Sequence, residues 1–392
     1  MQIESLDILS AGTGWRNLIV VKLTTDTGVV GYGEATIEYG DRALMAYLPE
    51  IFTAVKGRDP RDIDDVFAAM VYADYWRSGF IARTAFSAIE LACWDLKGRI
   101  AAKPVWQLLG GKRPQPLRAY ANGWYRSDRD PERIAELAQK VVARGYLALK
   151  IDPFGAGDKT LSPEEMEISL AIIRDVRLAV GDNVELFIEG HGRFDLDFAL
   201  VLAAAMEPYR PGFFEEPLIP ELNDQLPQLV SSTRIPIALG ERLSTPKLFE
   251  WVTSGCDNLV LQPDICHIGG INALTQVVHL AESRGWSVAP HNAGSPLATT
   301  HAVHLGIASP AIVVQETFDD FEEPWVRQGF AGHVQVNNGH YDVGSEPGFG
   351  VTVQEEVLAA HPMTDKHLDL YAEGWEQRTM ETGDTSCTNR LQ

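Results

Sequence analysis

Three glutamates stand out because each ends a short apolar run. They are Glu189, Glu215 and Glu241, and successive members are 26 residues apart. Short apolar runs predict buried strands, and the carboxyl ends of parallel strands meet at one edge. Carboxylates that close repel one another unless a cation neutralises them, and an all-oxygen ligand set suits Mg²⁺. We therefore predict that these three residues bind Mg²⁺. For any one of them a surface acid is the alternative, since the chain has 54 acidic residues.

Two histidines also follow apolar runs. His191 lies two residues after Glu189, and His291 ends a later run. In a closed ring of eight strands these histidines would lie on opposite sides. Asp264 ends the run before that of His291 and could orient this histidine and raise its basicity. We predict that His191, and His291 with Asp264, are catalytic residues that face a substrate from two sides. For a single histidine, a hydrogen-bonded structural residue is the alternative.

Further polar side chains end runs of the same series. Lys150 ends an apolar run, and we predict that its ammonium binds a substrate carboxylate oxygen. Asp152 lies two residues on and could pair with Lys150 or with Arg193, although a purely structural ion pair is the alternative. Glu316 could form a hydrogen bond to a substrate oxygen in its neutral form, or be an ordinary strand-end acid.

The elements that carry these residues repeat along the chain. From Glu189 to Glu316 the polar residues that end the runs are 23–27 residues apart. A period of about 25 fits one strand, one helix and two loops, so it predicts repeated β-α units. The interval before Glu189 is longer, at 39 residues, and we expect a long loop at 155–160. With a strand at 117–121 the units number about eight, which predicts a closed (β/α) barrel over 113–325.

Residues 1–112 show a pattern typical of an α+β domain. Alternating and β-rich runs up to about residue 35 predict strands, with a hairpin turn at 26–28. Apolar positions at three- and four-residue intervals predict helices from about 40 to 108. Glycines and prolines between 110 and 116 mark the boundary with the barrel. The β-α period stops after about residue 325, and we expect residues 326–392 to return to the first domain.

Composition limits the kind of protein further. The 392 residues carry a net charge of −21, which argues against nucleic-acid and anionic-membrane partners. The chain begins without a leader pattern and has no apolar run of about 18 residues, so a cytoplasmic location is expected. The four cysteines form no CxxC pair, and the glycine-rich pieces match no nucleotide-binding motif. A bound cation would offset the repulsion between this acidic chain and an anionic substrate.

The motifs around these residues resemble the enolase superfamily, in its mandelate-racemase-like subgroup, and are most similar to those of gluconate and galactonate dehydratases. The resemblance covers nearly the whole chain. The motifs that carry it are YANGWY at 120–125, LKIDPFG at 149–155, IEGHGRF at 188–194, GFFEEP at 212–217, ALGERL at 238–243, LQPD at 261–264, GG at 269–270 and HN at 291–292.

The resemblance implies a modified (β/α)₇β barrel with an α+β capping domain, Mg²⁺ held by the three glutamates, and a homo-oligomer. It also implies that the site is completed by Lys150, His191, His291 with Asp264, and Glu316. Loops of the capping domain at about 12–15 and 72–77 would supply specificity. The candidate substrate contacts are Trp15, Trp76, Asp152 and Arg193.

Two positions depart from the subgroup's pattern. Glu189 stands where many members carry aspartate, and Asp152 replaces a second lysine that the subgroup's racemases use as a base. The second departure argues against a two-base racemase of the lysine and histidine type. The expected function is a lyase that dehydrates an acid sugar, an aldonate such as gluconate or galactonate, to a 2-keto-3-deoxy sugar acid. An epimerase or lactone cycloisomerase on the same scaffold, or a non-catalytic sugar-acid binding protein, remains as an alternative.

Overall fold

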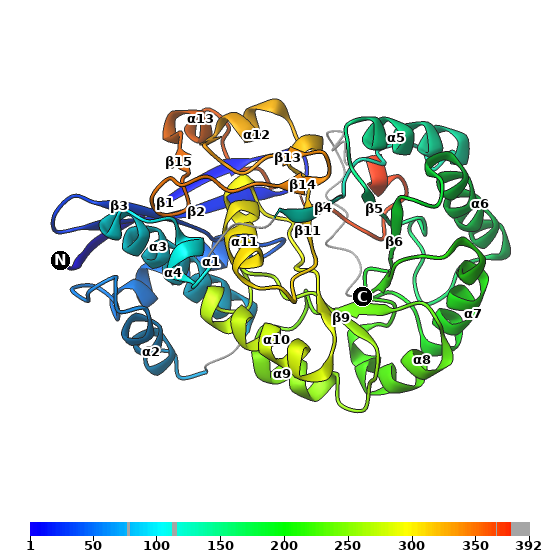
Figure 1. Ribbon diagram of the computed structural model, residues 1–392, viewed down its shortest axis with the longest axis horizontal. Coiled ribbons are helices and arrows are strands. Elements are labelled where there is room, and N and C mark those ends of the chain that lie inside the picture. Colours follow the sequence, from blue (N-terminus) through cyan, green and yellow to red (C-terminus); the bar gives the residue numbers. More distant parts are fainter. Residues whose placement is uncertain (77–78, 112–115, 366, 378–392) are drawn as a thin grey trace.

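The computed structural model of the protein describes residues 1–392 except 77–78, 112–115, 366 and 378–392. Parts of the predicted 72–77 loop and of the predicted domain boundary therefore lie outside the described residues. The chain forms an N-terminal capping domain beside a barrel of strands and helices (Figure 1).

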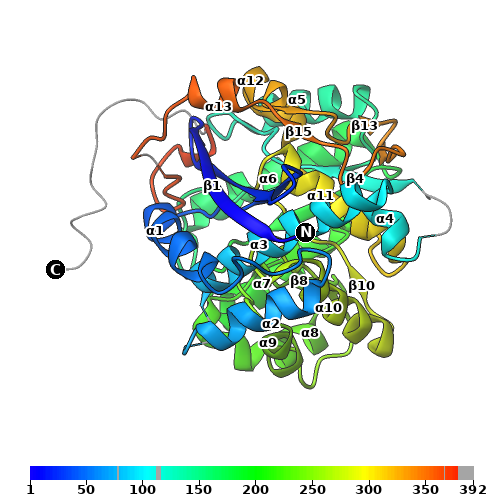
Figure 2. The ribbon, with the colours of Figure 1, turned by 90° about the vertical axis from the view of Figure 1, so that its left-hand side faces the viewer.

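The capping domain is a three-stranded antiparallel sheet covered by helices. Its strands pair in the order β1 (Ile3–Gly12), β2 (Asn17–Thr25) and β3 (Val30–Glu34). Its helices are α1 (Asp41–Phe52), α2 (Ile63–Ala73), α3 (Phe80–Ala101) and α4 (Val105–Leu108). When the left-hand side of Figure 1 faces the viewer, β1 and helices α1 and α2 lie in front of the barrel (Figure 2). The strands up to residue 35 and the helices after residue 40 agree with the sequence pattern.

Two glycines let α3 pack closely on β3. A β-carbon on Gly33 would collide with the carbonyl oxygen of Ala88, and one on Gly31 would collide with that of Ala92. The Gly-Tyr-Gly piece of the sequence therefore has a packing role, because only glycine admits such a close backbone approach.

The barrel strands follow the chain around a ring and are parallel. They are β4 (Leu117–Ala121), β5 (Ala148–Ile151), β6 (Glu185–Glu189), β7 (Phe214–Glu215), β8 (Ile237–Leu239), β9 (Leu259–Leu261), β10 (Ser287–Val288) and β11 (Val314–Thr317). Strand β11 pairs with β4, and a parallel bridge between Val288 and Ile312 links β10 to the segment leading into β11. These contacts close the ring.

Helices connect successive barrel strands in the described part of the chain. They are α5 (Pro131–Ala143), α6 (Pro163–Val180), α7 (Leu196–Met206), α8 (Leu226–Ser232), α9 (Pro246–Val252), α10 (Gly270–Arg284) and α11 (Pro296–Ala308). Short 3₁₀ turns η1 (Glu207–Tyr209) and η2 (Pro220–Gln225) follow α7 and β7. The expected (β/α)₇β barrel with an α+β capping domain is confirmed.

Local sequence explains where several of these helices begin. Ser162, Thr245 and Ser295 each cap a helix through a side-chain oxygen that accepts a backbone N–H, and proline follows each of them. Asp130 caps α5 in the same way. Such a cap satisfies a free N–H of the first turn, and proline at the next position loses no helical hydrogen bond.

Aromatic side chains fill the interior of the barrel beneath the strand ends. The rings of Phe187 and Phe213 stack with centroids 3.9 Å apart, and Tyr120 packs edge-on against Phe187. Ala148, Ala238 and other small residues complete this cluster. The polar groups at the strand ends therefore lie above a layer of packed apolar side chains.

The C-terminal segment divides between the two domains. Helices α12 (Pro324–Gln328) and α13 (Glu355–Ala359) follow η3 (Asp319–Phe321), and β12 (Phe330–Ala331) pairs with β15 (Thr352–Val353). Side chains of this group pack with Ala11, Leu18 and Val20 of the capping domain.

One part of this segment joins the barrel instead. Strands β13 (Val336–Asn337) and β14 (His340–Tyr341) form a hairpin, and β14 pairs with β4. The turn η4 (Trp375–Gln377) ends the described chain. The division into 1–112, 113–325 and a return over 326–392 therefore stays an interpretation. None of the described helices has the length and apolar character needed to span a membrane.

Candidate active site

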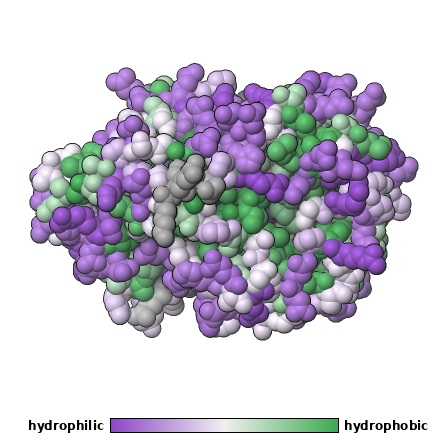
Figure 3. Space-filling model, viewed as in Figure 1, coloured by the Kyte–Doolittle hydropathy of each residue, from purple (hydrophilic) through white to green (hydrophobic). Residues whose placement is uncertain are grey.

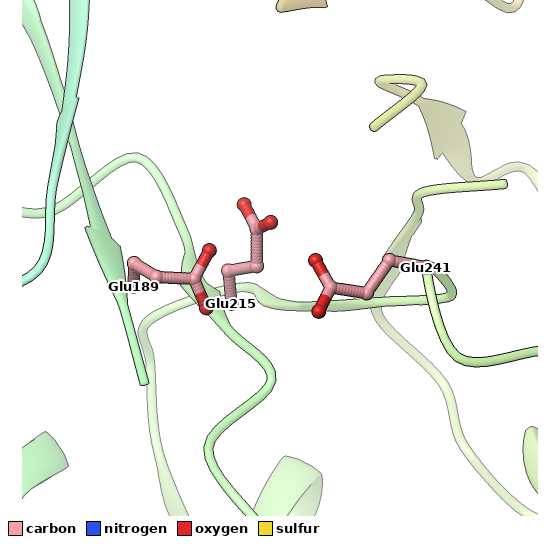
Figure 4. Close-up of side chains that lie close together, drawn as sticks. All are labelled: Glu189, Glu215 and Glu241. Carbon is pink, nitrogen blue, oxygen red and sulfur yellow. The ribbon is translucent and has the colours of Figure 1, made fainter. Parts of the chain in front are cut away.

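The three predicted metal ligands come together at the carboxyl ends of neighbouring strands. Glu189 and Glu215 are the last residues of β6 and β7 and lie opposite each other in register, and Glu241 follows β8. One oxygen of each carboxylate lies within 4.8 Å of the others. Glu189 and Glu241 point toward each other, with Glu215 between them (Figure 4). Adjacent strands place these residues side by side although 26 positions separate them in the sequence.

A single ammonium group lies among these acids. The Nζ of Lys150, which is almost completely buried, is 2.9 Å from Glu189 Oε2, 2.5 Å from Glu215 Oε1 and 2.9 Å from Glu316 Oε1. Burial would raise the pKa of Glu189, but the positive charges of Lys150 and His191 outweigh it, and the pKa lies below its ordinary value. Burial and the charge of Glu189 raise the pKa of Glu215. The negative charge of the cluster exceeds what one lysine neutralises, so the cluster can bind a divalent cation.

His291 and Asp264 form a pair on one side of the cluster. His291 Nδ1 lies 2.7 Å from Asp264 Oδ2, and His291 Nε2 lies 3.4 Å from Glu241 Oε2. Burial would lower the pKa of His291, but Glu241 and Asp264 raise it well above its ordinary value. Because Asp264 occupies Nδ1, the other ring nitrogen is the one available toward the metal cluster.

His191 has an aspartate partner of its own. His191 Nδ1 lies 2.5 Å from Asp152 Oδ2, and Arg193 Nη2 lies 2.5 Å from the same oxygen. The backbone N–H of His191 donates to Glu189 Oε1 at 2.7 Å. His191 has a φ of 51°, a left-handed conformation that turns the chain directly after β6. The site therefore has two histidine and aspartate pairs. The histidines follow the third and seventh strands of the ring, and the aspartates follow the second and sixth.

The pairing of His191 changes the interpretation of two residues. Asp152 and Arg193, expected to contact substrate, are 2% and 0% exposed and lie outside the lining of the cavity. Of the two partners considered for Asp152, the structure gives Arg193 rather than Lys150. Arg193 also donates to the carbonyl oxygen of Gly190 at 3.1 Å. Asp152 therefore orients the His191 ring through Nδ1, Arg193 orients Asp152, and neither residue lines the cavity.

Glu316 is held by donors alone. Its Oε1 accepts from Asn122 Nδ2 at 2.8 Å and lies beside Lys150, and its Oε2 accepts from the backbone N–H of Asn292 at 2.9 Å. These contacts fix the direction of the carboxyl group at the end of β11. The hydrogen bond from Glu316 to a substrate oxygen, expected from the sequence, stays a prediction.

Three polar residues support the acids, although the sequence reasoning assigned them no role. Asn122 contacts Glu316, Gln262 Nε2 donates to Glu215 Oε2 at 2.6 Å, and Arg242 Nη1 lies 2.6 Å from Glu241 Oε1. Each lies within a motif that carries the family resemblance. Its position at a strand end was a usable signal, but the oxygen that it contacts depends on side-chain direction.

The cluster opens into a cavity of about 550 Å³ between the barrel and the capping domain. Lys150, Glu189, His191, Glu241 and His291 line it from the barrel. The capping-domain side is largely apolar and includes Trp15, Ile37, Phe80 and Ile81. Hydrophobic surface is also exposed near the middle of the face shown in Figure 3, within mostly hydrophilic surroundings.

The two predicted tryptophan contacts differ in position. Trp15 is 3% exposed and lines the cavity, and its Nε1 donates to Glu322 Oε1 at 3.2 Å. Trp76 is 79% exposed and is not among the described residues that line the cavity. Trp15 is therefore placed to contact a ligand, whereas Trp76 is not placed there in this structure.

Two family models match the chain over almost its whole described length. Residues 8–110 match the mandelate racemase / muconate lactonizing enzyme N-terminal domain, and residues 133–357 match the enolase C-terminal domain-like family. The chain belongs to the mandelate racemase / muconate lactonizing enzyme family of the enolase superfamily. It is therefore an enzyme, and the paired histidines, Lys150 and the carboxylate cluster occupy the strand-end positions where barrel enzymes of this kind carry out their chemistry.

Individual relatives agree with the family. The D-gluconate dehydratase of Thermoproteus tenax is 39% identical over 87% of this chain and 69% of the relative. The D-gluconate/D-galactonate dehydratase of Picrophilus torridus is 31% identical over 91% of this chain and 93% of the relative. A mandelate racemase/muconate lactonizing enzyme from Sulfitobacter sp. has a similar structure, with a TM-score of 0.88, 31% identity, and coverage of 95% of this chain and 98% of that one. The named curated relatives are dehydratases, which are lyases.

Proposed function

We propose that the protein is a Mg²⁺-dependent acid-sugar dehydratase that converts an aldonate to a 2-keto-3-deoxy sugar acid. The observation that carries this proposal is the pair of histidine and aspartate couples on opposite sides of a three-carboxylate cluster. A dehydration of this kind needs a base for the proton at C2 and an acid for the hydroxyl leaving C3. The names of the gluconate and galactonate dehydratase relatives support the choice of substrate class.

His291 is the proposed base. Asp264 accepts from its Nδ1, and Nε2 faces Glu241 at 3.4 Å. A cation that neutralises Glu241 would favour the neutral ring, whose Nε2 would take the C2 proton of a substrate bound over the cluster. Removing that proton places negative charge on the substrate carboxylate oxygens. Lys150 lies among the acids at the same strand ends and is the side chain proposed to stabilise that charge.

His191 is the proposed acid. Its protonated form, held by Asp152, would give a proton to the C3 hydroxyl as it leaves. The resulting enol then tautomerises to the keto acid. Trp15 and the apolar capping-domain side chains would exclude water from this step.

Glu189, Glu215 and Glu241 would hold Mg²⁺, because they offer carboxylate oxygens within 4.8 Å of one another. When bound, Mg²⁺ stabilises the negative charge that develops on the substrate carboxylate. The homo-oligomer expected from the family resemblance is part of this proposal, and light scattering of the purified chain measures it.

A panel of mono- and diacid sugars tests the proposal. Each sugar is incubated with enzyme and Mg²⁺, and keto acid is measured with semicarbazide. We expect keto acid from one or a few aldonates, and none after chelation of the metal or with His291→Asn. Binding of aldonates without turnover across the panel would favour a non-catalytic binding protein instead.

The two histidines also fit a second reaction class, in which one removes the C2 proton and the other returns it from the opposite face. That arrangement is what a 1,1-proton-transfer epimerase requires, and a lactone cycloisomerase begins with the same proton removal. Exchange of the C2 proton in deuterated water without keto acid would favour these reactions over dehydration.

A further inference from the structure

Helix α3 of the capping domain presents a buried polar ridge to the barrel. Thr84, Ser87 and Glu90 are three residues apart, lie on one face of the helix and are each 0% exposed. All three contact the segment 264–272, which carries Asp264. Ser87 Oγ accepts from the backbone N–H of Gly269 at 2.9 Å, and Glu90 accepts from those of Ile271 and Asn272 at 3.1 Å each.

The glycine pair after Asp264 follows from this contact. Gly270 has a φ of 80°, and a β-carbon there would collide with the carboxylate of Glu90. Glu90 accepts the first N–H groups of α10, where a buried acceptor is favourable. The segment is therefore fixed to the capping domain by its backbone, close to the residues that form the proposed base.

His267 connects this ridge to the aspartate. Its Nδ1 lies 3.0 Å from Thr84 Oγ1, and its Nε2 lies 3.7 Å from Asp264 Oδ2. When the Thr84 hydroxyl donates to Nδ1, the imidazole carries its proton on Nε2, toward Asp264. The edge of the His267 ring packs against Phe80 with centroids 6.0 Å apart.

The carboxylate of Asp264 thus has three neighbours, two within hydrogen-bond distance and His267 at 3.7 Å. Oδ1 accepts from the backbone N–H of Cys266 at 2.7 Å, and Oδ2 faces both His291 and His267. Burial alone would raise the pKa of Asp264, but the two histidines outweigh it and the pKa lies below its ordinary value. A carboxylate with fewer partners could rotate, and His291 would lose its fixed orientation.

We propose that His267 is a positioning residue that orients Asp264 and, through it, the base His291, and that Thr84 of the capping domain fixes His267. This series of contacts, which we call the Thr84–His291 relay, runs from the capping domain to the cavity side of the barrel and consists of Thr84, His267, Asp264 and His291. The inference rests on the proposed function only in taking His291 as the base. It assigns the capping domain a part in arranging the catalytic groups, in addition to covering the cavity.

Two substitutions at position 84 test the Thr84–His291 relay. Thr84→Val keeps the shape of the side chain and removes the hydroxyl, whereas Thr84→Ser keeps the hydroxyl. We expect Thr84→Val to lower kcat about tenfold, with KM and Mg²⁺ affinity unchanged and a larger isotope effect for substrate deuterated at C2. Thr84→Ser should restore kcat. Thr253→Val is the matched control, because it removes another buried threonine hydroxyl, which donates to the carbonyl oxygen of Phe249.

A double substitution tests whether the residues act through one route. His267→Gln should lower kcat at least as much as Thr84→Val, and adding Thr84→Val to it should cause little further loss. If the two losses of kcat multiply in the double variant, Thr84 and His267 act independently, which would overturn the proposal. Equal kcat in wild type and Thr84→Val would overturn it as well.

A measurement without substrate separates this inference from the proposed function. In enzyme labelled with ¹⁵N-histidine, the His291 signals, assigned with His291→Asn, should shift in Thr84→Val and His267→Gln but not in Thr84→Ser or Thr253→Val. Unshifted signals would exclude the positioning role. If wild type dehydrates no acid sugar, the proposed function fails, and these spectra still decide whether the Thr84–His291 relay orients His291.

Discussion

Glu189, which stands where many members of the resembled subgroup carry aspartate, has two hydrogen-bond partners. His191 N donates to its Oε1 and Lys150 to its Oε2. We predict that Glu189→Gln lowers Mg²⁺ affinity by more than about tenfold and abolishes activity, because the amide removes one negative charge from the ligand set. Calorimetric Mg²⁺ titration measures the first effect. Glu185→Gln, at the exposed start of the same strand, is the control. Normal Mg²⁺ binding by Glu189→Gln would show that this carboxylate is not a ligand.

Substitutions of the two histidines should have different effects on the two steps of the reaction, C2 proton removal and loss of the C3 hydroxyl. We predict that His291→Asn lowers both C2 proton exchange and dehydration by at least about 100-fold, because the base is lost. His191→Asn should lose dehydration but keep C2 exchange, because its proton is needed only when the hydroxyl leaves. Proton NMR in deuterated water and the keto-acid assay measure the two steps. Full dehydration by His191→Asn would contradict the assignment of the acid.

At the scale of residues, the sequence predicted which side chains come together in the candidate site better than it predicted their hydrogen-bond partners. Strand-end positions brought Glu189, Glu215 and Glu241 to one place, since neighbouring parallel strands share an edge. The aspartate partner of His191 was not anticipated. Alternation along a strand tells which face a residue such as Asp152 occupies, but not whether its carboxylate turns toward a lysine, an arginine or a histidine.

At the scale of elements, the contact between α3 and β3 depends on glycine. We predict that Gly33→Ala destabilises the protein by about 1–3 kcal/mol, since the added methyl group would collide with the carbonyl oxygen of Ala88 and force the helix away from the strand. Chemical denaturation measures the change. Gly344→Ala is the control, because a β-carbon there meets only Glu346 N, at 3.9 Å. An equal effect of the two substitutions would exclude the close packing as the cause.

Elements with a strong period were predictable, and short ones were not. Helices α6, α9 and α11 each begin at a serine or threonine followed by proline, a local signal that needs no tertiary information. The run 259–264 was expected to be a strand throughout, but pairing ends at Leu261 and the rest forms the loop that carries Asp264. The hairpin of β13 and β14 has two residues in each strand and no apolar period, so its pairing with β4 could not be predicted.

At the scale of the whole molecule, two buried histidines lie where the barrel meets the capping domain. His301 and His304 are on α11, and their rings pack against Phe349. The backbone N–H of Trp106, in α4, lies 3.4 Å from His304 Nδ1. Burial lowers the pKa of each histidine to about 3. Both are therefore neutral at neutral pH in the folded protein.

These histidines should make the domain contact sensitive to acid. An unfolded histidine has a pKa of about 6.5, so between that value and about 3 the unfolded chain binds more protons than the folded one. Stability must then fall as the pH drops below about 6.5. We predict that His304→Asn, which keeps an acceptor for Trp106 but does not titrate, loses about 1–2 kcal/mol less than wild type between pH 7 and pH 5.

Comparison of the variant with wild type isolates this effect from opposing groups. Glu90 and Asp319 are buried carboxyl groups whose pKa is raised to about 7, so their contribution to stability increases as the pH falls toward their unfolded values. Both groups remain in His304→Asn and cancel in the difference. Urea unfolding at pH 7, 6 and 5 measures that difference, with the half-buried His340→Asn as control. Parallel loss of stability in wild type and His304→Asn would mean that His304 is already protonated in the folded protein, and that its contact with Trp106 is not the acid-sensitive link between the domains.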